Sequence, residues 1–126
     1  MAVHKRKINP AGGPVEVELT AGFRHILTYR TVLMKGDGSD QQEAIPPGNT
    51  IDALPDAGVL PLAAAQLTGR FFAVDGLLSP ARVTSANQNW SLQIDIRQNG
   101  AIVAGGPVVV KGQLKSTIAI LEHIEL

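Results

Sequence analysis

The segment from Asn89 to Gly100 restricts the fold more than any other part of the sequence. From Trp90 to Arg97 every second position is apolar and the positions between are polar, which is typical of a strand with one face in a core and the other in solvent. The Asn99-Gly100 pair favours a two-residue hairpin turn, because both central residues of that turn need a positive φ. We therefore expect an antiparallel hairpin in which residues 101–104 return beside the first strand. The residues expected to face the core are Trp90, Leu92, Ile94 and Ile96.

Strand patterns continue on both sides of this hairpin. The segment from Phe23 to Met34 is rich in β-branched and aromatic residues, and we expect Phe23, Leu27, Tyr29 and Leu33 to share its inner face. About eight short strands, with turns roughly every 8–12 residues, predict an all-β fold that is an antiparallel β-sandwich or jelly roll. The other expected strands are Pro14–Thr20, Arg70–Val74, Leu77–Ser85 after a break at Asp75-Gly76, Val108–Leu114 and Thr117–Leu126.

Residues 35–69 have a different composition. Glycine, proline, aspartate and asparagine are frequent there, which indicates one long loop excursion from the sheets. Because a structureless loop of this length is uncommon in a small domain, we expect a short edge strand near residues 50–54. A short helix is expected over residues 61–68, since Pro61 suits the first helical position and Gly69 suits the position after the end.

The length of 126 residues predicts one domain, assigned to residues 14–126, behind a flexible and solvated basic arm at residues 1–13. Eleven basic and eleven acidic side chains give a formal charge of zero, which argues against nucleic acid as a partner. The sequence has no cysteine, which excludes disulfides, thiolate metal sites and cysteine nucleophiles.

No apolar run approaches the ~20 residues of a membrane span. The basic residues near the N-terminus resemble the start of a signal peptide, but the apolar stretch of roughly 7–15 residues that should follow is missing. We therefore expect no cleavable signal, and a cytoplasmic location is favoured over secretion.

Catalytic motifs are missing from the sequence. There is no GxSxG elbow, no phosphate-binding GxxxxGK[ST] and no GxGxxG after a strand. His4, His25 and His123 are scattered without metal-ligand spacing. We expect His25 to be a hydrogen-bonded core or edge histidine and His123 to face solvent. The sequence thus favours a protein that is not an enzyme and needs no cofactor.

One acidic cluster has residue types that suit a metal ion. Asp37, Asp40 and Glu43 are weak candidates as oxygen ligands for calcium, but their spacing does not match an EF-hand loop. A solvated loop tip explains them better, so we predict no metal site.

Charge is distributed unevenly along the chain. Residues 36–69 hold five acidic residues and no lysine or arginine, whereas a basic cluster lies near the N-terminus. One interpretation is ordinary surface scatter. The other is a pair of complementary surfaces on a non-catalytic interaction or assembly module that associates with copies of itself through strand edges and loops. The residues of these two surfaces are Lys5, Arg6 and Lys7 on one and Asp37, Asp40, Glu43, Asp52 and Asp56 on the other.

The alternative function is a carbohydrate- or small-ligand-binding β-sandwich, with or without the assistance of calcium. Asn87, Asn89 and Trp90 are its candidate ligand residues, because amides bond sugar hydroxyls and an aromatic ring can form a platform. Trp90 has a second interpretation as an anchor of the core. The small number of aromatic residues, five in the whole chain, counts against the carbohydrate alternative.

Overall fold

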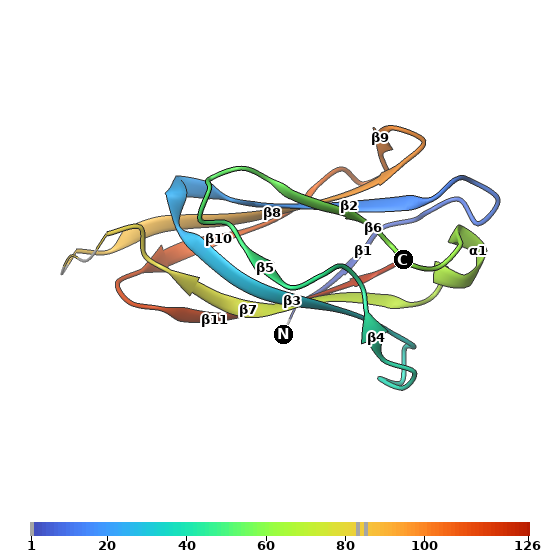
Figure 1. The fold of residues 1–126 in the computed structure, drawn as a ribbon, viewed down its shortest axis with the longest axis horizontal. Coiled ribbons are helices and arrows are strands. Elements are labelled where there is room, and N and C mark those ends of the chain that lie inside the picture. The colour runs from blue at the N-terminus through green and yellow to red at the C-terminus, as the bar shows by residue number, and fades with distance from the viewer. Residues whose placement is uncertain (1, 83, 85) are drawn as a thin grey trace.

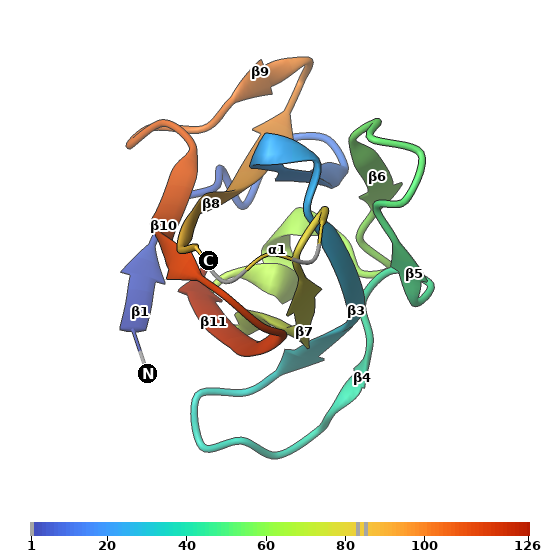
Figure 2. The same ribbon diagram turned by 90° about the vertical axis from the view of Figure 1, so that its left-hand side faces the viewer.

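A computed structural model of the chain describes residues 2–82, 84 and 86–126. Two β-sheets pack face to face, as the upper and lower layers of Figure 1 and the end view of Figure 2 show. The predicted all-β sandwich is therefore confirmed. The described residues form eleven strands instead of the expected eight or so. Eight of them are longer, and the other three have only two residues each.

The first sheet has the strand order β1-β11-β7-β3-β4, and β5 also pairs with β3. Its strand pairs are antiparallel except that β1 and β11 run parallel. The bounds are β1 (Ala2–Lys5), β3 (Ile26–Met34), β4 (Gln42–Glu43), β5 (Gly48–Asn49), β7 (Phe71–Ser79) and β11 (Ile118–Glu125).

The second sheet has the order β10-β8-β2-β6, with β9 also paired with β8, and all of its pairs are antiparallel. Its bounds are β2 (Val15–Ala21), β6 (Asp56–Val59), β8 (Gln88–Gln98), β9 (Ala101–Ile102) and β10 (Val108–Leu114). A single 3-10 turn, η1 (Gly22–Arg24), joins β2 to β3, and a short helix, α1 (Ala64–Leu67), precedes β7.

The core lies between the inner faces of the two sheets. In β8 the predicted alternation is confirmed, since Leu92, Ile94 and Ile96 are fully buried, while Trp90 is half-buried at the end of the strand. Asp95 departs from the alternation, because it is buried although it lies on the outer face. Its carboxylate accepts hydrogen bonds from the side chains of Gln93 and Arg97, which cover it.

The hairpin turn is confirmed. Asn99 and Gly100 both have positive φ, 55° and 78°, as a two-residue hairpin requires. The returning strand is shorter than expected, since β9 ends at Ile102 and Ala104 instead makes an isolated bridge to Lys7.

The expectation of a solvated arm over residues 1–13 is wrong for residues 2–5 and for Ile8. Residues 2–5 form β1, which covers the edge of β11, and Ile8 is buried in the core. The unpaired backbone groups of the β11 edge and the apolar side chain of Ile8 both favour this docking over exposure to water.

The helix expected in the excursion is confirmed by α1, but it covers only Ala64–Leu67, so Pro61 lies before it and not at its first position. The edge strand expected near residues 50–54 is wrong, because residues 51–54 form a turn and the sheet pairings fall in β4, β5 and β6. Thr50 explains the difference: its hydroxyl accepts a hydrogen bond from the backbone N–H of Leu27 and donates one to the carbonyl of His25. The buried side chain of Thr50 thus forms hydrogen bonds to the backbone here, in place of further strand pairing.

The break expected at Asp75-Gly76 is also wrong, since β7 runs without interruption from Phe71 to Ser79. Gly76 belongs there because the backbone of β3 approaches closely: a Cβ atom at this position would lie 2.4 Å from the carbonyl oxygen of Thr28. The strand ends before Pro80, which has no N–H to donate. The end predicted at Ser85 lies outside the described residues.

Candidate functional site

The outer face of the first sheet carries large apolar side chains in contact with solvent. Val3, Leu77 and Leu121 are each about half exposed, at 49%, 54% and 47%. Ala119 is exposed beside them. We call these four residues the apolar stripe.

Strand register makes the stripe continuous. Ala119 lies directly opposite Leu77, and Leu121 is two residues further along β11, within diagonal reach of Leu77. Val3 lies opposite His123 on the other side of β11, so Leu121 is its diagonal neighbour as well. The stripe therefore crosses three adjacent strands, β1, β11 and β7, without interruption.

His123 lies on this outer face, as the alternation predicts, but it is half-buried rather than open to solvent. Its ring meets the ring of Phe71 edge-on, with the centroids 6.2 Å apart. This pair extends the apolar character of the face beyond the stripe.

The charged groups beside the stripe form pairs with each other. Arg30 Nη2 lies 3.1 Å from Asp75 Oδ2, and Lys5 Nζ lies 3.7 Å from Glu125 Oε2. The outer face of the second sheet also carries exposed apolar side chains, Val59 and Val109, but these lie in β6 and β10 at opposite edges of the sheet. Between these edges is a polar network in which Arg97 contacts both Glu18 and Asp95. The two outer faces therefore differ in chemistry.

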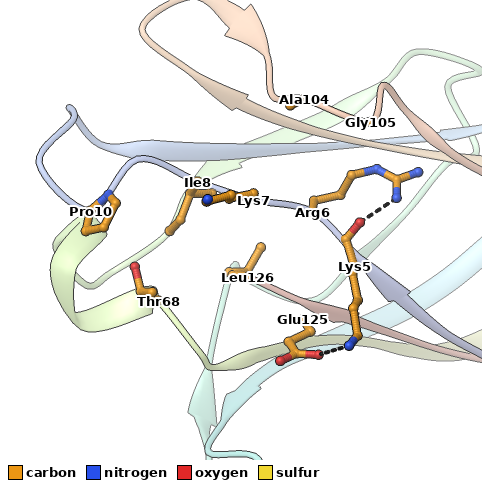
Figure 3. Close-up of a pocket in the computed structure, with 10 residues that line it drawn as sticks. All are labelled: Lys5, Arg6, Lys7, Ile8, Pro10, Thr68, Ala104, Gly105, Glu125 and Leu126. Carbon is orange, nitrogen blue, oxygen red and sulfur yellow. Dashed lines mark hydrogen bonds and ion pairs between the residues drawn. The ribbon is translucent and has the colours of Figure 1, made fainter.

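The basic residues predicted as an interaction surface lie along a groove of about 470 Å³ (Figure 3). Arg6 is used inside the chain: its guanidinium donates to the carbonyl oxygens of Lys5, Gly106 and Pro107. Lys5 pairs with Glu125, as drawn in Figure 3, and Lys7 remains exposed. Arg6 therefore fastens the N-terminal segment to the loop before β10.

The five acidic residues of the excursion have different partners. Asp40 pairs with Arg70 at 2.9 Å, and Asp56 accepts a hydrogen bond from the phenol of Tyr29. Asp52 accepts the backbone N–H of Leu54, and Glu43 is exposed in β4. Each of these carboxylates thus has its own local surroundings.

Asp37 stabilises a turn. The hydroxyl and the backbone N–H of Ser39 both donate to its carboxylate, and these bonds hold the pKa of Asp37 below its usual value. Among the described residues, no group of three or more histidine and acidic side chains is close enough together to hold a metal ion.

The residues of the carbohydrate hypothesis lie at one end of the sandwich, on the left in Figure 1 and opposite α1. Two hollows of about 420 and 500 Å³ adjoin there and share Phe23 and Asn89 in their walls. Trp90 lines the first hollow and Asn87 the second. The structure therefore brings the three predicted ligand residues to one region.

Phe23 is a site residue that sequence reasoning missed. The pattern predicts it on the inner face of a strand, but its side chain is 62% exposed. The reason is its backbone: Phe23 and Arg24 both have a left-handed conformation, with φ of 59° and 61°, which ends the strand pattern before β3. No local sequence signal marks this, since neither residue type favours a positive φ.

His25 holds this end of the sandwich together. It is buried, its Nε2 donates to the carbonyl of Asn89 at 2.7 Å, and its Nδ1 accepts the backbone N–H of Ala81 at 2.9 Å. The prediction of a hydrogen-bonded core histidine is confirmed. The ring connects three segments that line the hollows.

The fold and these surfaces define the chain as a two-sheet β-sandwich with an apolar outer face and a polar, aromatic end. Comparisons with protein-family models, with curated proteins and with solved structures found no match. Within the described residues, no helix has the length and hydrophobicity needed to cross a membrane.

Proposed function

We propose that this chain is a non-catalytic assembly module that pairs with a second copy of itself through the outer face of its first sheet. The observation that carries the proposal is the apolar stripe, in which three large side chains stay about half exposed on adjacent strands. Contiguous apolar surface of this kind is typical of interaction sites.

A second copy is the partner that suits the charges of this face. Because Arg30 and Lys5 are already paired with acidic residues of the same face, two identical faces do not repel each other strongly. Contact between the same face on both copies is isologous and gives a closed dimer. This differs from a contact between the basic surface of one copy and the acidic surface of another, which the uneven charge pattern suggested, since Arg6 and Asp40 are occupied within the chain.

The stripe alone is small compared with a standard interface, which buries roughly 800 Å² on each partner. The His123–Phe71 pair and the free edge of β1 lie next to it and enlarge the contact. Burial of apolar surface contributes about 25 cal/mol per Å², and the entropy lost on association takes away part of that free energy. We therefore expect a dissociation constant in the micromolar range.

Sedimentation velocity over a concentration series tests the proposal. The parent chain should change from monomer to dimer, and a variant with Leu77→Lys and Leu121→Lys should remain a monomer. Val109→Lys is the matched control, because Val109 is equally exposed, at 51%, on the outer face of the second sheet. A parent that stays monomeric at high concentration, or a control that dissociates as fully as the double variant, would contradict the proposal.

A further inference from the structure

The end of the sandwich that carries the two hollows has a composition that self-association does not explain. Its described lining residues combine two aromatic rings, several amides and three cationic side chains, and they include no carboxylate. We propose that this end is a binding site for a short acidic oligosaccharide, that is, a sugar chain with carboxylate or sulfate groups.

The aromatic part consists of Phe23 and Trp90. The exposed ring of Phe23 lies near the buried ring of His25, with centroids 6.4 Å apart, and presents an apolar surface to solvent. The indole of Trp90 lies across Gly112, where a Cβ atom would come within 2.9 Å of its Nε1. The glycine therefore leaves room for the ring beside the first hollow, and the apolar C–H faces of a sugar can pack on both rings.

The amide part comes from β8 and β10. Gln113 donates to the side-chain oxygen of Asn89 at 3.4 Å, and each of these amides has a second polar atom that this bond does not use. In the second hollow, the side chain of Gln88 donates to the carbonyl of Arg82 and so ties the loop before β8 to the strand. Amides donate and accept together, which matches the hydroxyl groups of a sugar.

The charged part decides which sugars fit. Arg24, Arg82 and Lys111 line the hollows, and within the described residues none of them forms an ion pair with a carboxylate. Elsewhere in the described chain, Lys5, Arg30, Arg70 and Arg97 have acidic partners. Among the same described residues, Lys7, Lys35 and Lys115 have none either, so the position of Arg24, Arg82 and Lys111 around the hollows is what distinguishes these three. Cations without such partners in a hollow lined by amides favour an anionic ligand.

Single-stranded nucleic acid also offers rings, sugars and negative charge, but it fits less well. Its binding sites need a basic groove that follows the backbone over several nucleotides. Here the cations come from three separate segments, and the chain as a whole has no net positive charge. An oligosaccharide of a few residues suits hollows of about 420 and 500 Å³ better than a longer polymer.

Tryptophan fluorescence gives a direct test, because Trp90 is the single tryptophan in the chain. The full chain is titrated with oligogalacturonate, a heparin-derived tetrasaccharide, a neutral tetrasaccharide and oligo-deoxythymidine. We expect saturable changes with at least one acidic sugar, and affinity at least about tenfold lower for the neutral sugar and for the nucleotide, since a charged hydrogen bond contributes that much or more.

Two variants locate the site. Lys111→Glu should lower the affinity about tenfold or more, whereas Lys115→Glu, the same change at an exposed lysine outside the hollows, should leave it within about twofold. Phe23→Gly should also weaken binding, while the melting temperature should not fall, because glycine accepts the positive φ at that position without strain.

The double variant with Leu77→Lys and Leu121→Lys should bind the acidic sugar like the parent, so that the result does not depend on self-association. Equal binding of neutral and acidic sugars, tighter binding of oligo-deoxythymidine, or no saturable change with any probe would overturn the proposal. Equal losses in Lys111→Glu and Lys115→Glu would do the same.

Discussion

At the scale of single residues, Tyr29 connects the two sheets. It lies in β3 of the first sheet, is only 6% exposed, and donates a hydrogen bond of 2.8 Å to Asp56 in β6 of the second sheet. Burial raises the pKa of its phenol well above the ordinary value, and the bond to the Asp56 carboxylate and the charge of that group raise it further. The phenol therefore resists ionisation for as long as the protein is folded.

This pKa shift predicts how stability depends on alkaline pH. Below about pH 10, the usual phenol value, the folded and unfolded states both keep the proton and the contribution of Tyr29 is complete. Above that pH the unfolded chain loses the proton and the folded chain does not, so stability falls as the pH rises. Because Tyr29 is the single tyrosine, phenolate absorbance reports on it alone. Absorbance should rise together with unfolding, and a reversible titration near pH 10 in folded protein would contradict this.

Tyr29→Phe is the matching variant. It should lower the free energy of unfolding by about 1.5–3 kcal/mol at neutral pH, because Asp56 loses its donor. Its stability should then fall less steeply than that of the parent above about pH 10, since no phenol remains to ionise. A denaturant titration at several pH values measures both effects.

At the scale of secondary-structure elements, the hairpin between β8 and β9 depends on its two-residue turn. Gly100 has a φ of 78°, which a β-branched side chain resists. Gly100→Val should therefore reduce the free energy of unfolding by about 1–2 kcal/mol. Ala101→Val, one residue later in the exposed start of β9, should change it by less than about 0.5 kcal/mol. Equal effects of both variants in a denaturant titration would mean that turn strain is not the cause.

The same elements show what the sequence could predict. The inner face of β8 follows from local alternation, and the strand at residues 108–114 follows from its run of valines after the turn at residues 105–107. The pairing of β1 with β11 does not follow from any local pattern, since it joins segments more than a hundred residues apart. The continuity of β7 was not predicted for a similar reason. Gly76 is required by the close approach of β3, a distant segment, and not by a turn within its own segment.

At the scale of the whole molecule, the candidate sites are products of topology. Asn89 and Trp90 were identified from the sequence because they are adjacent. Lys111 joins them only through the order of strands in the second sheet, and Phe23 only through the turn before β3. The apolar stripe was not predicted at all. Its members come from residues 3, 77, 119 and 121, and no window of the sequence contains them together.

Self-association should also be visible in thermal unfolding. If two folded chains pair and the unfolded chains do not, raising the protein concentration stabilises the folded state by mass action. For a chain of 126 residues, we expect the melting temperature to rise by on the order of 2–4 °C for each tenfold increase above the dissociation constant. Differential scanning fluorimetry across a concentration series measures this.

In the variant with Leu77→Lys and Leu121→Lys the melting temperature should not depend on concentration, whereas in Val109→Lys it should rise as in the parent. A melting temperature independent of concentration in the parent, or an equal rise in the double variant, would show that the apolar stripe is not the contact between copies.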